Sequence, residues 1–291
     1  MKRYTSLGEL IKDYRAVYDI SQAELALKVG ADIRTIQRWE KDVTNIKLEK
    51  ELDFVRATLL PFQLVRNLNT LETISTFYDF KIRKYSLSKI NKEFPDPYSL
   101  KYKFIDSTDR IRTISVEEDL DYIMQYLHLP ERKRRNAYNI ISKVIELLPE
   151  LNLIITDQYG NYSGHAIYMP ISLADFNRIK NKELDVTDLK VSDFVNPKTQ
   201  ETPVFFNYDS TADCNDNIYY LVNHLFHFFK NIENQDYIFC AYNNRYDNAE
   251  FQKHVGLEVV WTDPVVEDSP IWAGPKKFLV GNFSDYLKDY K

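Results

Sequence analysis

The chain has 291 residues, 44% of them hydrophobic and 28% charged, a composition typical of a globular protein with about two domains. Its two cysteines, Cys214 and Cys240, lie far apart and exclude a disulfide framework or a cysteine-based zinc site. No apolar run reaches the length of a membrane span, and the N-terminus has no signal-peptide stretch. We therefore expect a cytoplasmic protein without a membrane partner.

Charge is distributed unevenly along the chain. Residues 1–66 carry a net charge of +2, residues 67–107 carry +2, and residues 108–291 carry −9, which together give −5. The acidic excess thus lies away from the N-terminal part. A net charge of +2 gives only modest non-specific attraction to nucleic acid, so specific binding there would need base contacts and two copies. We therefore expect a homodimer.

Residues 20–42 are the most informative segment. They contain two short helical patterns on either side of Gly30, which suits a tight turn because glycine adopts positive φ without strain. Ser21 followed three residues later by Glu24 predicts a capping box for the first helix. The arrangement predicts a helix-turn-helix, which can place its second helix in the major groove of DNA.

The second predicted helix has two distinct sides. Asp32 caps it, and Ile36 and Trp39 point inward. Its other side presents Ile33, Arg34, Gln37 and Arg38. A helical hairpin without any DNA role is the alternative.

Residues 6–60 resemble the lambda-repressor-like, Xre-type helix-turn-helix family. The resemblance rests on Ser21-Gln22, Leu25-Ala26, Gly30, Ile36 and Arg38-Trp39-Glu40. It implies an all-α bundle of about five helices, with Gln22 touching a phosphate and residues 32–38 facing base edges. The DNA-binding residues that it implies are Gln22, Asp32, Ile33, Arg34, Thr35, Gln37 and Arg38. The turn after Glu40 is Lys41-Asp42, where the family often has glycine.

The remaining pattern completes this domain over residues 1–68, with further helices predicted at 7–17, 46–59 and 62–68. Residues 69–107 are predicted to be a basic, aromatic-rich linker. Its segment 77–86 interleaves aromatic and basic residues. Such a segment either contacts a DNA backbone or, as we favour, packs its aromatic rings onto a domain.

From residue 108 the pattern becomes mixed α/β. Strands are predicted at 110–115, 151–156, 164–169, 204–208, 237–242, 257–262 and 277–280. Helices are predicted from 116, and at 131–148, 171–179, 218–232 and 248–255. Residues 108–291 resemble the GNAT superfamily of acyl-CoA-dependent N-acyltransferases in three stretches, Arg110–Leu120, Asp157–Pro170 and Asn248–Val260. The resemblance implies an α/β domain with a mixed sheet.

The residues that this family uses for chemistry are missing from the sequence. Its pyrophosphate loop uses closely spaced glycines and a basic residue, whereas Asp209–Asn217 has no glycine, Lys or Arg and contains three carboxylates. Gln252 stands where the family has a tyrosine acid. We therefore predict no catalytic residue and no cofactor, although the question of an enzyme stays open.

Two histidines and one cysteine could in principle bind a metal or react, but we interpret them as structural or surface residues. His224 and His227, three residues apart on a helix, are interpreted as a solvated or pocket-lining face rather than as metal ligands. Cys214, near a helix start, is interpreted as inert because no base is placed beside it.

These patterns lead to one functional hypothesis with two alternatives. We expect a sequence-specific transcriptional regulator whose C-terminal domain senses a small-molecule effector, dimerises or binds a partner. A cleft between strands 204–208 and 237–242 would take an aromatic or apolar effector. The alternatives are an active acyltransferase tethered to DNA and an antitoxin-type regulator.

Overall fold

A computed structural model describes residues 1–87, 109–127, 129, 131–233, 236–244, 249–264, 274–288 and 290. The chain divides into two compact units. The first comprises residues 1–91 together with 157–163 and 213–215, and the second comprises the rest. Two short segments from the second half of the chain therefore belong to the N-terminal unit.

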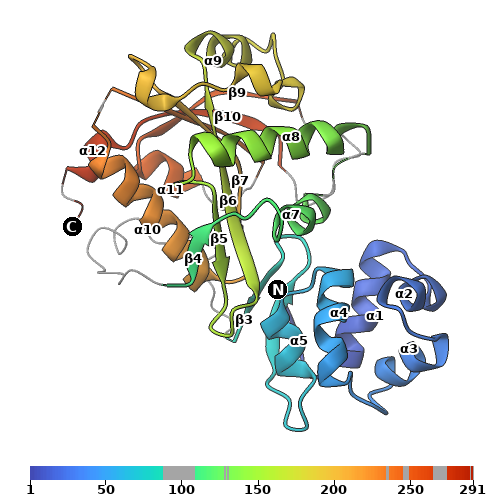
Figure 1. Cartoon of the computed structure of the whole chain (residues 1–291). Coiled ribbons are helices and arrows are strands. Elements are labelled where there is room, and N and C mark those ends of the chain that lie inside the picture. Colours follow the sequence, from blue (N-terminus) through green and yellow to red (C-terminus); the bar gives the residue numbers. More distant parts are fainter. Residues whose placement is uncertain are drawn as a thin grey trace. The chain divides into compact units, whose positions relative to one another are not determined.

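The first unit combines a helical bundle with a small antiparallel sheet (Figure 1). Its helices are α1 (Leu7–Tyr18), α2 (Gln22–Val29), α3 (Ile33–Glu40), α4 (Leu48–Thr58) and α5 (Phe62–Leu68). Its strands are β1 (Lys2–Tyr4), β2 (Thr76–Asp79) and β3 (Lys84–Ser86), in the order β1-β2-β3. The predicted helices are thus present. Of the range predicted as linker, residues 88–107 lie outside the described residues.

Residues 69–87, predicted to begin a linker, instead contribute β2 and β3 to this unit. Tyr78 is 2% exposed, and the Phe80 ring lies edge-on to Tyr78 at 4.8 Å and to Tyr4 at 6.4 Å between ring centroids. Burial of these rings stabilises the hairpin against the bundle. The aromatic rings of segment 77–86 therefore pack onto a domain, as we favoured. The linker prediction did not foresee that β2 pairs with β1 at the start of the chain.

The second unit is built around a mixed sheet in which the described strands have the order β4-β5-β6-β7-β8-β10-β9. The strands are β4 (Ile111–Thr113), β5 (Leu153–Thr156), β6 (Tyr162–Ile171), β7 (Val204–Ala212), β8 (Ile238–Asn243), β9 (Leu257–Thr262) and β10 (Lys277–Gly281). The helices are α7 (Leu120–Tyr126), α8 (Glu131–Leu147), α9 (Leu173–Lys180), α10 (Asn215–Asn231), α11 (Ala249–His254) and α12 (Ser284–Leu287). Short 3₁₀ turns η1 (Val186–Asp188), η2 (Val191–Asp193) and η3 (Pro197–Thr199) follow α9. This is the mixed α/β fold that the sequence predicts.

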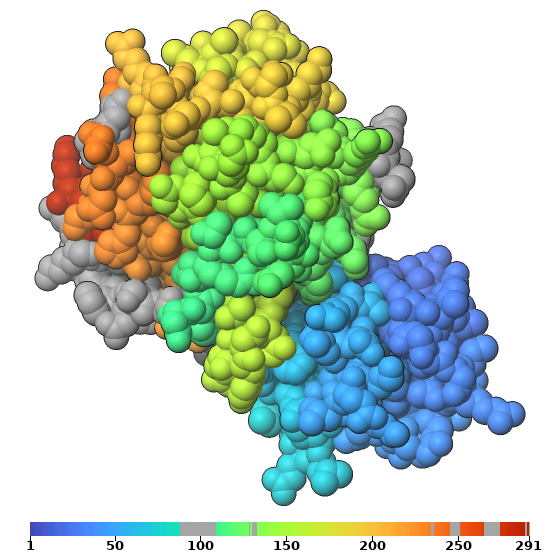
Figure 2. All heavy atoms as spheres, viewed as in Figure 1, coloured from blue at the N-terminus to red at the C-terminus, as the bar shows by residue number. Residues whose placement is uncertain are grey.

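The helices cover the sheet with apolar faces. In Figure 1, α8 crosses the strands, and the space-filling view shows its side chains and those around α9 closing that face (Figure 2). Phe229 of α10 lies edge-on to Phe205 of β7 at 5.1 Å and to Phe239 of β8 at 5.9 Å. Successive strand residues point to opposite faces, so Phe206 faces away from Phe205. In the described part of the chain, no helix is long and apolar enough to cross a membrane.

A bulge in β7 marks where the centre of the sheet opens. Ile167 of β6 pairs with Asp209, and the next residue, Tyr168, pairs with Asn207, so Tyr208 is the extra residue. Among the described residues, the parallel pairing of β7 with β8 runs from Val204 to Asn207, which is the residue before the bulge. The predicted cleft between 204–208 and 237–242 was therefore misplaced, because residues 204–207 are hydrogen-bonded to β8.

Candidate functional site

The turn between α2 and α3 has the predicted local geometry. The Ser21 side chain accepts from the Glu24 backbone N–H, and Glu24 Oε2 accepts from the Ser21 N–H at 2.7 Å, which forms the capping box. Gly30 has φ of 65°, in the left-handed region. Asp32 Oδ1 caps α3 by accepting from the Thr35 N–H at 2.7 Å.

A buried carboxylate fixes α3 against α1 and α2. Glu40 at the end of α3 accepts from Arg15 Nε at 2.5 Å and from Gln22 Nε2 at 2.6 Å. Its side chain is only 6% exposed, so the charge is stabilised by these two donors rather than by water. Gln37 Nε2 in turn donates to Gln22 Oε1 at 3.2 Å. Gln22, expected to touch a phosphate, is thus engaged in positioning α3.

The predicted DNA-binding residues separate into two groups. Asp32 and Thr35 bond to each other, with Thr35 Oγ1 donating to Asp32 Oδ2 at 3.0 Å, and so serve the helix cap. The side chains exposed on α3 are Ile33, Arg34, Gln37 and Arg38. Trp39 points the other way, is 8% exposed and packs edge-on to Phe54 with ring centroids 5.9 Å apart.

Asp42 replaces the glycine that often follows this helix in the resembled family. It adopts φ of 53°, and its carboxylate accepts from the Gly8 N–H and the Ser6 Oγ, both at 2.8 Å. A Cβ on Gly8 would lie 2.6 Å from the Trp39 carbonyl oxygen, so only glycine allows this close approach. The turn after α3 is therefore tied to α1.

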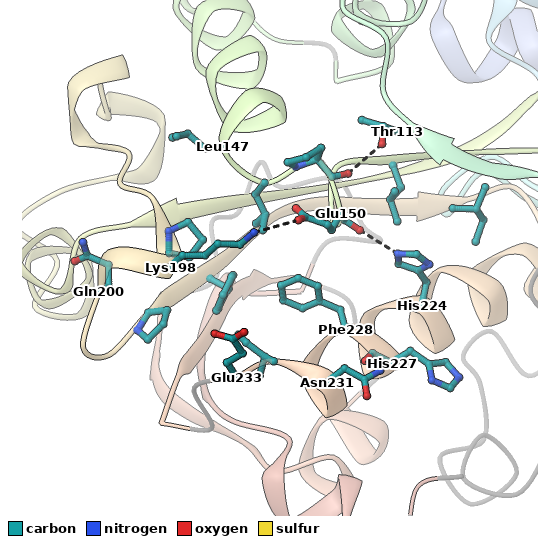
Figure 3. Close-up of a pocket in the computed structure, with 18 of the residues that line it drawn as sticks. Thr113, Leu147, Glu150, Lys198, Gln200, His224, His227, Phe228, Asn231 and Glu233 are labelled. Atoms are coloured by element: carbon teal, nitrogen blue, oxygen red, sulfur yellow. Dashed lines mark hydrogen bonds and ion pairs between the residues drawn. The ribbon is translucent and has the colours of Figure 1, made fainter.

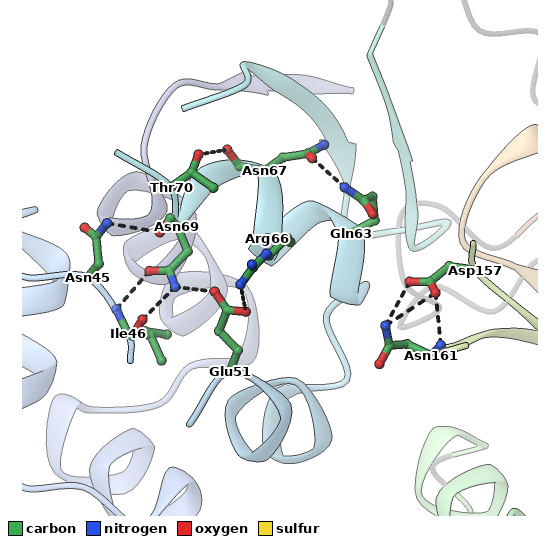
Figure 4. Close-up of polar contacts among 10 residues, drawn as sticks. All are labelled: Asn45, Ile46, Glu51, Gln63, Arg66, Asn67, Asn69, Thr70, Asp157 and Asn161. Atoms are coloured by element: carbon green, nitrogen blue, oxygen red, sulfur yellow. Dashed lines mark hydrogen bonds and ion pairs between the residues drawn. The ribbon is translucent and has the colours of Figure 1, made fainter. Parts of the chain in front are cut away.

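A second polar network fixes the segment between α3 and α4 (Figure 4). Asn69 accepts from the Ile46 N–H and donates to the Ile46 carbonyl, both at 2.8 Å, and also donates to Glu51 at 2.5 Å. Arg66 donates to the other oxygen of Glu51 at 2.7 Å. These contacts tie the segment after α3 to α4 and to the end of α5.

The second unit carries a histidine–aspartate pair beside the β7 bulge. His165 of β6 is fully buried, and its Nε2 lies 2.7 Å from Asp209 Oδ2, whose side chain is 34% exposed. Tyr126 lies edge-on to the His165 ring at 5.5 Å, and its hydroxyl is 3.1 Å from Thr211 Oγ1. A carboxylate held by a buried imidazole and open on one side is suited to accept a proton. The sequence did not identify this pair, because its members are 44 residues apart.

The loop predicted to correspond to a pyrophosphate site is shorter than expected. Residues 209–212 belong to β7, and α10 begins at Asn215. Asp213 donates its N–H to the Ser163 carbonyl at 2.8 Å and accepts from the Ser163 hydroxyl at one carboxyl oxygen. Desolvation raises the pKa of Asp213 to about 7.

A lysine from β3 reaches this loop, which the sequence could not predict. Lys84 is 2% exposed and its Nζ lies 3.2 Å from Asn215 Oδ1, while the Tyr85 N–H donates to the Asp213 carbonyl at 2.8 Å. The loop thus has a nearby cation but engages the Asp213 N–H internally. The segment also carries the carboxylates of Asp209, Asp213 and Asp216, which would repel a pyrophosphate.

The remaining candidates occupy structural positions. Gln252 lies on α11 and is 8% exposed, and Cys214 is half-buried at the start of α10. His224 Nε2 lies 3.0 Å from the Glu150 carbonyl oxygen, and His227 is exposed.

Comparisons with known proteins give structural matches only. No protein-family model matches the sequence, and no curated protein matches it. One solved structure is of a histone acetyltransferase HPA2 and related acetyltransferase from Corynebacterium glutamicum, with 11% identity, coverage of 59% of this chain and 94% of that chain, and a TM-score of 0.32. Another is Chaetomium thermophilum Naa20 in complex with a bisubstrate analogue, with 12% identity, coverage of 61% and 88%, and a TM-score of 0.38. Neither is described as a DNA-binding protein. TM-scores this low give no support to a function, so any functional proposal has to rest on the residues of this chain.

Proposed function

We propose that this chain is a sequence-specific DNA-binding regulator in which α3 lies in the major groove. The observation that supports it is the exposed side of α3. Arg34, Gln37 and Arg38 project there from a helix held by the buried Glu40 network. Arginine and glutamine are side chains that form paired hydrogen bonds with guanine and adenine edges, each worth about 1–3 kcal/mol of discrimination.

The anchoring of α3 favours this function over a plain helical hairpin. Glu40 and Asp42 bind groups of α1 and α2 at the end of the helix, so little ordering of α3 is needed on binding. The modest positive charge of residues 1–66 makes binding by one copy weak, so we expect two copies on a palindromic site. The second unit would then dimerise, bind a partner or bind an effector.

Selection from a random duplex library tests this function without knowledge of the operator. The full-length protein should enrich one motif with related half-sites about 10 base pairs apart, or a multiple of that spacing. Enrichment should survive competition by heparin, since base contacts resist a polyanion that displaces non-specific binding. A library that stays random after repeated rounds would contradict sequence-specific binding.

A second candidate function is N-acyl transfer by the second unit. The observation that favours it is the His165–Asp209 pair at the opening of β7 and β8, where the exposed carboxylate could accept a proton from an amine. The two solved structures reported above are both acetyltransferases, the class of this candidate. The three carboxylates of residues 209–217 do not favour the pyrophosphate of acyl-CoA.

A thiol-release assay with acetyl-CoA and a mixture of amines tests this candidate. Turnover that falls at least about 100-fold in Asp209→Asn, the range for loss of a general base, would establish it. Asp188→Asn, an exposed aspartate on η1, is the matched control and should keep full activity. Absence of both turnover and calorimetric binding of acetyl-CoA would exclude it and leave the DNA-binding proposal unaffected.

A further inference from the structure

A large cavity lies beside α10 in the second unit, away from the His165–Asp209 pair. Its volume is about 810 Å³, within the range of pockets that hold small molecules. Figure 3 shows its walls, which come from α10, the end of α8 and the segment around η3. The edge strand β4 and the first residues of β5 and β7 also line it.

The inner surface of the cavity is apolar. Its apolar lining includes Ile111, Leu148, Leu153, Phe205, Phe228 and Ile232. Phe228 lies edge-on to Phe205 with ring centroids 5.7 Å apart, which gives the cavity an aromatic wall. An apolar hollow of this size on a folded domain is a typical mark of a binding site.

The two cations at the rim, Arg112 and Lys198, are each paired with a carboxylate. Arg112 donates to both carboxyl oxygens of Asp119, at 2.5 and 2.8 Å. Lys198 Nζ lies 3.9 Å from Glu150 Oε1, so these charges also offset each other. A ligand anion would therefore find both cations already paired, and a further carboxylate, that of Glu233, also lines the cavity.

Two histidines provide the polar groups along one edge. His224 Nε2 lies 3.0 Å from the Glu150 carbonyl, and because a carbonyl only accepts, this nitrogen carries the hydrogen. With the hydrogen on Nε2, Nδ1 is the ring nitrogen that can accept a hydrogen bond from a ligand. Partial desolvation, followed by the nearby Lys230 and His224, lowers the pKa of His227.

We infer that this cavity binds an uncharged, largely apolar small molecule that carries one hydrogen-bond donor. The apolar part would lie against the Phe228 wall, and the donor would face a histidine of α10. The inference does not depend on either proposed function, since both DNA binding and acyl transfer use other residues.

Two fluorescent probes that differ in one charge test this inference on the full chain. N-phenyl-1-naphthylamine is uncharged, apolar and has one N–H, whereas 1-anilinonaphthalene-8-sulfonate adds a sulfonate to the same rings. The uncharged probe should bind saturably with a Kd of roughly 1–10 μM, and the sulfonate at least about tenfold more weakly. Equal affinity for both probes, or no saturable binding of the uncharged one, would overturn the inference.

Substitutions that fill the cavity test whether the probe binds there. Ile111→Trp fills the hollow from β4 and should weaken binding of the uncharged probe at least about tenfold. Val259→Trp is the matched control, because it adds the same indole to β9, the opposite edge strand of the same sheet. It should change the affinity by less than about twofold.

Two further variants complete the test. One replaces Ile111→Trp if that variant does not fold, and the other tests the histidine edge of the cavity. Gln200→Trp fills the cavity from the segment after η3 and should have the same effect if Ile111→Trp fails to fold. His224→Phe keeps a ring but removes the acceptor, and should weaken the uncharged probe about threefold to fivefold. Unchanged binding in both cavity-filling variants would show that the probe lies elsewhere and would refute the site.

Discussion

At the scale of single residues, Asp213 is the aspartate whose surroundings change its chemistry most. Its carboxyl accepts from the Ser163 hydroxyl in a desolvated site, and its pKa rises to about 7. Between its ordinary pKa and pH 7, the unfolded chain would ionise this group while the folded chain keeps the proton. Its contribution to stability is therefore present at low pH and is lost as the pH rises toward 7.

Asp213→Asn should remove this pH dependence, because asparagine keeps the carbonyl acceptor for Ser163 but cannot ionise. Relative to this variant, the parent should lose roughly 3 kcal/mol of unfolding free energy between about pH 4.5 and pH 7.5. Urea denaturation of both proteins at the two pH values measures the difference. A constant difference between parent and variant would contradict the raised pKa.

Residue-level prediction from the sequence succeeded where the determining partner is a near neighbour. Ser21 and Asp32 cap their helices by bonding to groups three residues away, so their roles follow from spacing alone. Gln22, Lys84 and Asp209 contact residues 18, 131 and 44 positions away. No local pattern reports such partners, so the contact of Gln22 with Glu40 was not foreseen, and Lys84 and Asp209 were not recognised as site residues. The phosphate contact expected of Gln22 stays a prediction.

At the scale of elements, the described helices and most strands follow their apolar periodicity. Three short strands, β1 to β3, were missed because each has three or four residues and pairs with a segment distant in sequence. β7 was predicted to end at 208 but continues to Ala212. The second half of β7 is polar and shows no alternation of apolar and polar residues, and the bulge at Tyr208 shifts its pairing register with β6. The sequence pattern therefore did not indicate that the strand continues.

The bundle around α3 depends on one aromatic residue. Trp39 packs against Phe54 and is 8% exposed, so Trp39→Ala should lower the unfolding free energy of the first unit by roughly 3–5 kcal/mol. Amide hydrogen exchange of α1–α5 measures this loss directly. Leu71→Ala, at a side chain that is 99% exposed, is the control and should change exchange little. Unaltered protection in Trp39→Ala would show that this residue does not hold the bundle together.

At the scale of the whole molecule, the chain combines a helical unit that carries a small sheet with an α/β unit that contains a cavity. The two-part organisation follows from the change of periodicity near residue 108. The sequence could not show that residues 157–163 and 213–215 belong to the first unit, because that depends on contacts between distant segments. The seven described strands of the second unit confirm a mixed sheet, while its activity stays a proposal.

The most direct test of the central claim is a footprint on the duplex that the protein itself selects. The parent and Lys12→Ala, an exposed control on α1, should protect the selected half-sites equally. Arg34→Ala combined with Gln37→Ala should lose that protection, since it removes side chains worth about 1–3 kcal/mol each in base discrimination. Its circular dichroism should match the parent, because both side chains are exposed. A footprint from the folded double variant identical to that of the parent would show that α3 does not read DNA.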